Sequence, residues 1–365
     1  ELPIDSTFFS NIEKLRKLLK NVSLKNLNVD FRDYSIISYQ LYKDLIKPVQ
    51  NLITGKDLVI IPDGILGYIP FEALISKLPD IKKVDYRNLF YLIKNYSISY
   101  SYSATLLFKD YKTKTTGNEV LAFAPTYEIT DKTEKTQSFV LNKPGYTLAP
   151  IKNAKTEINN INEIFDGKFL QDLDATELNF KTNANNFDVL HFAMHTIIND
   201  ENPMYSKMVF TLDNDSVEDG FLNTYEIYNL DLNARLVVLS ACNTGFGKLN
   251  KGEGIMSLTR GFLYAGVKSI IMTLWEIEDK SGAEIMTKFY NNLKKENSID
   301  NALRKAKLDY IKSALPLRAH PYFWAAYIDI GNSAPLYKNT LINPIMLSVI
   351  ILIIITIIAV WFYRK

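Results

Sequence analysis

Two side chains that can do nucleophilic chemistry stand at the ends of two mostly apolar runs. The single cysteine of the chain, Cys242, follows the run 236–241, and His195 follows the run 187–194. Such runs are typical of buried strands in a parallel sheet, and the carboxyl ends of these strands meet at one edge. An imidazole beside a thiol promotes the thiolate, which attacks a carbonyl carbon. The pattern therefore predicts acyl-transfer chemistry by a Cys/His pair.

Strand-like and helix-like segments alternate along the chain and would position these two residues. We predict strands at residues 58–61, 97–102, 120–123, 189–192, 208–212, 236–239, 269–274 and 323–330. We predict amphipathic helices at residues 8–20, 33–53, 154–165, 254–264, 280–295 and 299–312, with Pro48 bending or restarting the second. Apolar strands that alternate with amphipathic helices indicate an α/β fold whose mostly parallel sheet is covered on both faces.

The amino-acid composition excludes several classes of partner and cofactor. Of the 365 residues 47% are hydrophobic and 22% are charged, which is typical of a packed globule. The formal net charge of +2 provides no electrostatic reason to expect nucleic acid as a partner. With three histidines, one cysteine and no HExxH or P-loop pattern, we predict neither a metal site nor a cofactor. The single cysteine excludes an internal disulfide and is compatible with a reducing compartment.

We predict that the C-terminal segment 345–363 is a membrane-spanning helix, which follows a linker at residues 333–344. It is uncharged and has close to the roughly 20 apolar residues that cross a bilayer core. Trp361 and Tyr363 suit the membrane interface, where Arg364 and Lys365 would reach the lipid headgroups. The flanking charges do not decide the orientation. The free thiol favours a cytoplasmic domain on a single-pass anchor in the cell membrane.

Five blocks, in order, resemble the CHAT domain, a caspase-like relative of the separases among the cysteine peptidases. They are LVIIPDGILGYIPFEAL, DVLHFAMHT, LVVLSACNTG, GEGIMSLTRGFLYAGVKSIIMTLWEIED and HPYFWAAYIDIG, at residues 58–74, 188–196, 236–245, 252–279 and 320–331. The resemblance implies a caspase-like three-layer α/β/α sandwich over residues 54–332 and a protein or peptide substrate.

The same resemblance bears on the N-terminal region. CHAT domains commonly follow tetratricopeptide repeats, and some relatives occur in bacterial signalling assemblies. Residues 1–53 are then either the end of such an array or a helical cap of the CHAT fold. The chain opens at Glu1 without methionine or a signal-like stretch, so we expect it to continue a longer protein with a regulatory partner acting through its repeats.

The resemblance also assigns catalytic roles. Cys242 would be the nucleophile, although a lone cysteine after an apolar strand is more often a small buried side chain. His195, the last histidine of its block, would be the general acid and base. The other candidate for this role is His191, which we predict to be a hydrogen-bonded core residue.

Backbone amides would hold the tetrahedral oxyanion. The turn after the cysteine supplies those of Asn243 and Gly245, and the residue after the histidine supplies another. That residue is usually glycine in the family and is Thr196 here. Threonine still carries an N–H group, but it restricts the backbone and adds bulk.

Candidate pocket residues lie at the same predicted sheet edge. They are Ser240, two residues before the cysteine, and Trp275, Glu276 and Asp279 after the strand 269–274. An acidic pocket would favour Arg or Lys before the scissile bond. The alternative for Asp279 is that it caps the helix beginning near Lys280, because aspartate is a preferred N-cap residue.

Three functions remain open at this point. The first is a membrane-anchored cysteine endopeptidase that cleaves a protein partner. The second is a catalytically degenerate CHAT scaffold or signalling module, a reading that Thr196 favours. The third is an acyltransferase or amidase that uses the same thiol on a small substrate.

Overall fold

The computed structural model describes most of the predicted globular region. It describes residues 5–55, 57–108, 119–127, 148–199, 201–212, 217–240, 249–250, 254–255, 258–295 and 298–336, together with Leu352, Thr356 and Tyr363. Cys242, Asn243 and Gly245 lie outside these residues.

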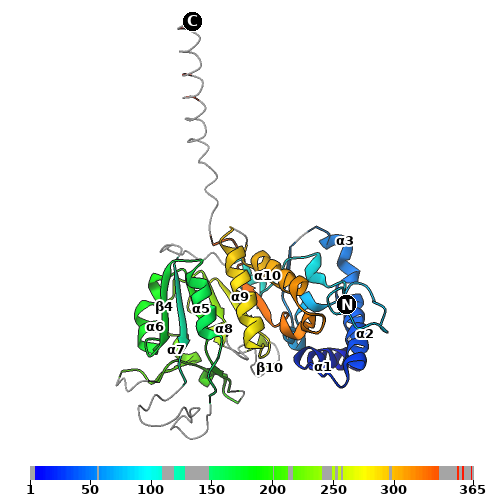
Figure 1. Ribbon diagram of the computed structural model, residues 1–365, viewed down its shortest axis with the longest axis horizontal. Helices are drawn as coiled ribbons and strands as arrows, with labels where there is room; N and C mark the ends of the chain where they lie inside the picture. The colour runs from blue at the N-terminus through cyan, green and yellow to red at the C-terminus, as the bar shows by residue number, and fades with distance from the viewer. Residues whose placement is uncertain are drawn as a thin grey trace.

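An eight-stranded sheet forms the centre of the fold (Figure 1). Its order is β1-β2-β13-β12-β9-β5-β3-β4, and every neighbouring pair is parallel except β12 and β13. The strands are β1 (Leu58–Ile60), β2 (Ile98–Tyr100), β3 (Val120–Pro125), β4 (Gly167–Asp172), β5 (Val189–Phe192), β9 (Leu236–Leu239), β12 (Ser269–Thr273) and β13 (Tyr327–Gly331). The predicted α/β fold with a mostly parallel sheet is confirmed.

Helices cover both faces of this sheet. On β5, His191 faces α5 and α9, through Glu157 and Tyr290, whereas the next residue, Phe192, contacts Phe180 of α6 and Phe262 of α8. Because successive strand residues point to opposite faces, α5 and α9 lie on one side and α6 and α8 on the other. The bounds are α5 (Ala154–Asn162), α6 (Glu177–Asn183), α8 (Leu258–Tyr264), α9 (Asp279–Leu293) and α10 (Ile299–Ser313), with α10 packed beside α9.

Two small sheets and short helices complete the domain. The antiparallel strands β6 (Thr196–Ile197), β7 (Lys207–Val209) and β8 (Phe221–Asn223) form an accessory sheet directly after His195. Strands β10 (Leu249–Asn250) and β11 (Gly254–Ile255) form a hairpin. The remaining short α-helices are α3 (Gln50–Ile53), α4 (Ala104–Leu107) and α7 (Thr224–Ile227).

The N-terminal helices share the core of the sheet domain. Helix α1 (Ser6–Lys20) begins after Asp5, whose carboxylate accepts the Phe8 amide hydrogen at 2.8 Å, and it buries apolar residues at helical spacing. Helix α2 (Leu27–Leu45) ends shortly before Pro48, and the Ser38 hydroxyl donates to the Ala73 carbonyl at 3.2 Å. The domain boundaries at residues 53 and 332 remain predictions.

The predicted membrane anchor requires a correction. A helix that crosses a bilayer needs a continuous apolar stretch of roughly 20 residues. Among the helices that the structure describes, none is long and apolar enough to do this. Of the segment 345–363 only Leu352, Thr356 and Tyr363 are described. The prediction of a single-pass anchor in the cell membrane is therefore wrong on this finding.

Candidate active site

His195 is held by its backbone at the carboxyl edge of the sheet. Three residues after the end of β5, its N–H donates to the Tyr127 hydroxyl at 2.9 Å, and its carbonyl accepts the Val209 amide hydrogen at 2.9 Å. The Tyr127 and His195 rings lie 4.8 Å apart. The end of β3 and the accessory sheet thus fix the position of the half-buried imidazole.

A carbonyl oxygen selects the tautomer of this imidazole. His195 Nε2 lies 2.6 Å from the backbone oxygen of Ala149. A carbonyl can only accept a hydrogen bond, so Nε2 carries the hydrogen and the neutral ring keeps Nδ1 as its basic nitrogen. The contact leaves Nδ1 available as a proton acceptor.

His191 has a different environment. It is fully buried, with Nδ1 3.0 Å from the Tyr290 hydroxyl and Nε2 3.0 Å from Oε1 of Glu157. The second pair is close but not aligned as a hydrogen bond. This is the environment of a core histidine, in contrast to the half-buried ring of His195 at the sheet edge.

The strand that leads to the cysteine lies directly beside β5. Strand β9 pairs in parallel with β5, with Val238 opposite His191, and the Ser240 amide donates to the Phe192 carbonyl at 3.0 Å. The ends of the two strands meet at one edge, as the sequence predicted. The predicted nucleophile itself and the turn after it lie outside the described residues.

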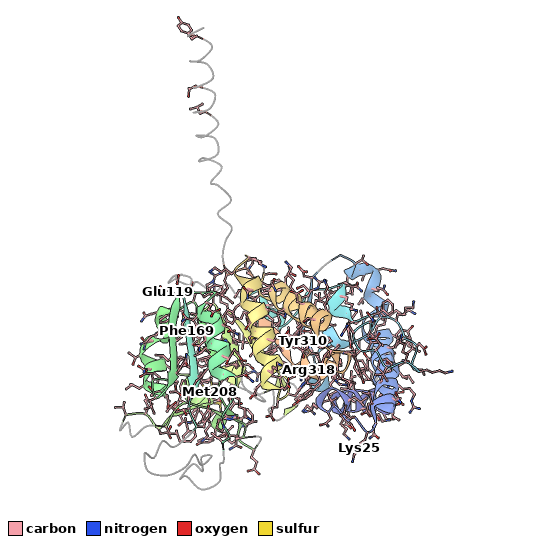
Figure 2. The ribbon with its side chains drawn as sticks, in the orientation of Figure 1. Lys25, Glu119, Phe169, Met208, Tyr310 and Arg318 are labelled. Atoms are coloured by element: carbon pink, nitrogen blue, oxygen red, sulfur yellow. The ribbon has the colours of Figure 1, made fainter. Side chains whose placement is uncertain are left out.

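Thr196 begins the accessory sheet. It pairs in antiparallel fashion with Met208 of β7, labelled in Figure 2, and is half-buried. Its role as an oxyanion donor stays a prediction.

A small acidic cavity opens between the ends of β5 and β9 and the start of α9. Ser240, Glu157, Asp279 and Tyr327 contribute to its lining, and its volume is about 20 Å³, room for about one water molecule. The Ser240 and Tyr327 hydroxyls are 3.0 Å apart. The structure thus brings two of the four predicted pocket residues, Ser240 and Asp279, to one cavity.

The other two predicted pocket residues lie elsewhere. Trp275 is buried, and its indole N–H donates to the Tyr322 carbonyl at 3.0 Å. Glu276 is exposed. Neither side chain lines the acidic cavity.

The helix-capping alternative for Asp279 is wrong, because Glu278 is the N-cap of α9. Its carboxylate accepts the Ser281 amide hydrogen at 3.3 Å and forms an ion pair with Arg318. Arg318 and Tyr310 lie close to this helix end, and the Tyr310 hydroxyl is 3.0 Å from that of Ser281 (Figure 2).

Asp279 is consequently the first residue of α9 and faces the cavity. Burial raises the pKa of Asp279 above its usual value, although a hydrogen bond from the Lys152 amide acts in the opposite direction. Proximity to His195 also favours the ionised carboxylate.

Glu157 is the pocket residue that sequence reasoning missed. It is 5% exposed and lies in α5. The signal was its position: Ala154, Ile158 and Ile161 form the apolar stripe of this helix, and Glu157 falls on the same face. A carboxylate on a buried helical stripe can indicate a functional site.

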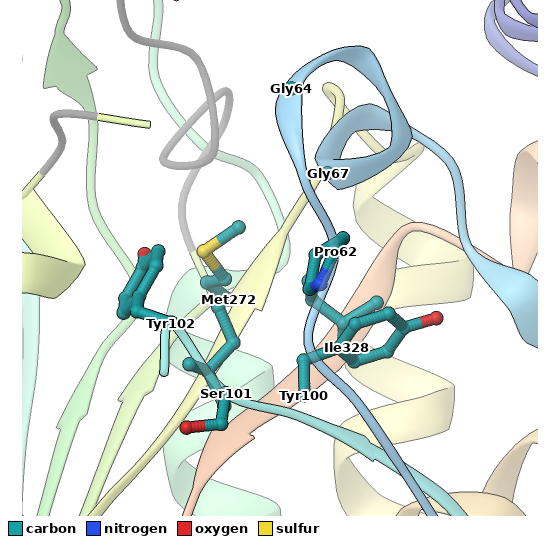
Figure 3. Close-up of a pocket in the computed structure, with 9 residues that line it drawn as sticks. Pro62, Gly64, Gly67, Tyr100, Ser101, Tyr102, Met272 and Ile328 are labelled. Carbon is teal, nitrogen blue, oxygen red and sulfur yellow. The ribbon is translucent and has the colours of Figure 1, made fainter. Parts of the chain in front are cut away.

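A second cavity is apolar and lies on the opposite side of the sheet (Figure 3). Pro62, Tyr100, Met272 and Ile328 contribute to its lining, and its volume is about 30 Å³. Met272 and Ile328 are paired across β12 and β13 and alternate with Tyr327, which faces the acidic cavity. The two cavities are therefore separated by the sheet.

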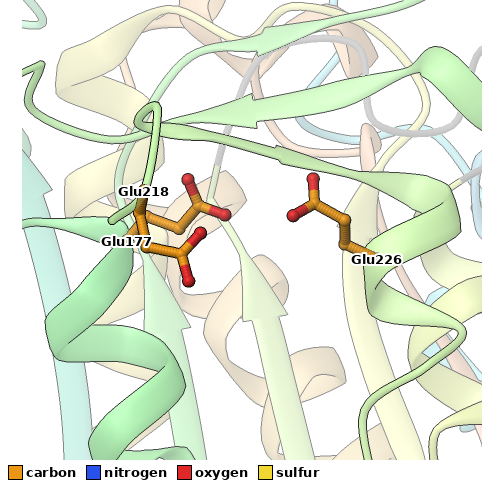
Figure 4. A group of neighbouring side chains, drawn as sticks. All are labelled: Glu177, Glu218 and Glu226. Atoms are coloured by element: carbon orange, nitrogen blue, oxygen red, sulfur yellow. The ribbon is translucent and has the colours of Figure 1, made fainter. Parts of the chain in front are cut away.

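Three carboxylates converge at a third place, as Figure 4 shows for Glu177, Glu218 and Glu226. The ammonium group of Lys181 lies 2.8, 2.7 and 2.9 Å from their oxygens, respectively. Burial raises the pKa of Glu177 to about 7, although Lys181 acts against this. Because a lysine already occupies the centre, we interpret the group as an ion-pair network that joins α6 to α7 and to the segment before β8.

Comparison with known proteins places the chain in a family. The model of the CHAT domain matches residues 36–332, and the chain belongs to this family. Human tetratricopeptide repeat protein 28 is 23% identical over 329 residues, covering 77% of this chain and 12% of that protein. The mouse protein of the same name is 28% identical over 119 residues, covering 32% and 5%. The chain thus spans a small part of these relatives.

The chain is also similar in part to solved structures of cysteine peptidases. The Arg-specific cysteine proteinase gingipain R matches with a TM-score of 0.48 and 10% identity, covering 91% of this chain and 76% of that chain. The Saccharomyces cerevisiae separase–securin complex matches with a TM-score of 0.46 and 10% identity, covering 91% and 23%.

Proposed function

We propose that this chain is a cysteine endopeptidase that uses Cys242 and His195 on a protein or peptide substrate. The observation that supports this most directly is the geometry of His195. Its ring is tied through Nε2 to Ala149, it keeps Nδ1 basic, and it follows the strand next to the one that runs through Ser240 toward the only cysteine.

The proposed reaction has two stages. His195 Nδ1 takes the proton of Cys242, and the thiolate attacks the scissile carbonyl carbon. Amides of Thr196, Asn243 and Gly245 would stabilise the oxyanion, and His195 returns the proton to the leaving amine as the C–N bond breaks. The thioester is then hydrolysed by a water molecule that His195 deprotonates, which regenerates the thiol.

We further propose that the acidic cavity binds a basic side chain before the scissile bond. Glu157 and Asp279 line it, and none of the described lining residues carries a positive charge. A guanidinium or ammonium group would pair with these carboxylates. Because the cavity has room for about one water molecule, it must open when a substrate binds.

The first test is labelling of Cys242 with a peptide probe that carries Arg and a thiol-reactive carbonyl electrophile. We expect rapid labelling of the native chain, and loss of that labelling in His195→Ala. Quenched peptides with Arg or Lys before the bond should be cleaved, whereas matched peptides with Asp or Gly there should not. A native thiol that reacts no faster than in His195→Ala would reject the peptidase proposal.

The alternative is a catalytically degenerate CHAT scaffold or signalling module. Thr196 in the place of the family's usual glycine and the narrow cavity favour it. Labelling only after denaturation would support this alternative. Rapid labelling and thioester turnover on small amides, without peptide cleavage, would favour an acyltransferase or amidase.

Control of the site is a further part of the proposal. The matched relatives are named tetratricopeptide repeat proteins, and we propose that repeats preceding this domain bind a regulatory partner. The proposal predicts that a longer protein carrying such repeats changes its labelling rate when the partner binds.

A further inference from the structure

A larger cavity lies next to the acidic one. It is formed between the end of β3 and residues 150–155, and its volume is about 280 Å³, against about 20 Å³ for the acidic cavity. Ile151 and Ala154 line both cavities, so the two lie on either side of one short segment. This cavity has the volume for a substrate side chain.

The larger cavity carries positive charge. Lys152 and Lys155 both contribute to its lining. Lys155 Nζ lies 2.6 Å from Oδ1 of Asp172, and both side chains are about half exposed. Lys152 is exposed, and within the described part of the chain it forms no ion pair. Among the described residues, the charge of Lys152 is thus not offset by an ion pair.

The cavity is connected to the candidate catalytic histidine through Tyr127. This tyrosine lines the cavity, and its hydroxyl accepts the His195 N–H at 2.9 Å. In the proposed reaction His195 protonates the leaving amine, so the leaving part of the substrate departs on the histidine side. The acidic cavity, which includes Ser240 directly after the strand that leads to the proposed nucleophile, would then lie on the acyl side.

We infer that the larger cavity binds an acidic side chain of the substrate, shortly after the scissile bond. This inference rests on the proposed peptidase function and makes its substrate class more specific. The substrate segment would carry a basic residue before the bond and a glutamate or aspartate within the next three positions. Two neighbouring cavities of opposite charge would then set both the binding register and the direction of the peptide.

Binding to a catalytically dead chain tests this without requiring turnover. Labelled peptides would carry Arg before the intended bond and either Gln at the next three positions or Glu at one of them. With Cys242→Ser we expect Glu at one position to tighten Kd by about fivefold at low salt, and salt to weaken the effect. Lys152→Gln should remove the preference, and Lys152→Glu should reverse it toward Lys at that position.

Lys168→Gln is the matched control, because Lys168 is an exposed lysine at the opposite end of β4 from Asp172. It should keep the full preference. The inference would be overturned if the Gln peptide and the peptides with Glu at each of the three positions bound with equal affinity. It would also be overturned if no peptide bound measurably. A preference that survives in the Lys152→Gln, Lys155→Gln double variant would overturn it as well.

Cleavage of the same peptides by the unaltered chain separates this inference from the proposed function. A Glu preference in binding without any cleavage would reject the peptidase and retain the cavity. Cleavage that does not distinguish Glu from Gln would retain the peptidase and reject the cavity.

Discussion

His191 and His195 are four residues apart and have opposite surroundings. The first points into the core between α5 and α9, with Glu157 and Tyr290 on its two nitrogens. The second has left the strand, and a carbonyl oxygen holds one of its nitrogens. Buried and partnered groups stabilise a fold, whereas a half-buried imidazole whose Nδ1 is not bonded to any of the described residues can exchange protons.

Replacing each histidine should therefore have different consequences. We expect His191→Ala to lower the free energy of unfolding by about 1–3 kcal/mol, because two buried polar partners lose their contact. His195→Ala should cost less than about 1 kcal/mol, since its side chain is half-buried and its polar contact within the described residues is with the Ala149 carbonyl. Urea denaturation measures both. A His191→Ala chain of normal stability that nevertheless cannot be labelled would contradict our assignment.

The lining of the acidic cavity leads to a prediction for Asp279. Asp279→Asn should lower kcat/KM for Arg peptides about tenfold or more, because the neutral amide cannot pair with the guanidinium. Glu276→Gln is the control, because it removes an equal charge from an exposed side chain three residues before Asp279. Peptide kinetics at two salt concentrations would measure this. Equal losses in both variants would mean that long-range charge, and not the cavity, controls the preference.

At the scale of elements, the antiparallel pair β12 and β13 contains a buried carboxylate. Asp329 accepts hydrogen bonds from Ser269 at 2.5 Å and Ser333 at 2.6 Å, and burial raises its pKa to about 7. The fold thus favours the protonated acid. The protonated Asp329 contributes its full stabilisation to the folded state below about pH 4, where the unfolded chain also binds the proton. This contribution is lost as the pH rises toward 7.

Asp329→Asn should therefore flatten the dependence of stability on pH in this window. Each unit of pKa shift corresponds to roughly 1.4 kcal/mol between the two protonation states. Urea denaturation from pH 4 to 8 is the measurement, with exposed Asp80→Asn as the control. Glu177, with a pKa also raised to about 7, acts in the same direction, so some slope should persist. An unchanged slope in Asp329→Asn would show that Asp329 is ionised throughout.

At the scale of the whole molecule, a buried ion pair joins distant segments. Lys307 of α10 lies 3.1 Å from Glu72, which also accepts a hydrogen bond from the Tyr100 hydroxyl of β2. Both charged side chains are almost fully buried, and burial lowers the pKa of Lys307. The pair connects the 3-10 turn Phe71–Ala73, which lies between β1 and β2, to helix α10.

Lys307→Met should lower the free energy of unfolding by about 3–5 kcal/mol, because it leaves Glu72 buried without its cation. Adding Glu72→Gln should recover part of this loss, since no unpaired charge remains. Lys312→Met, at an exposed position near the end of the same helix, should change stability by less than about 0.5 kcal/mol. A Lys307→Met chain as stable as the unaltered chain would contradict a stabilising role of this ion pair.

The sequence alone predicted the α/β fold with a mostly parallel sheet and named the candidate histidine. Burial repeats along each segment, so apolar runs predicted the strands of the central sheet apart from β4 and placed His195 after one of them. What surrounds that residue was decided by tertiary structure. The Ala149 carbonyl that contacts His195 comes from another part of the chain, and so does Glu157 in the acidic cavity. The N-cap residue of α9 is Glu278 and not the predicted Asp279. Local periodicity identifies elements, but strand order and helix packing bring such distant segments together, and no single segment carries that information.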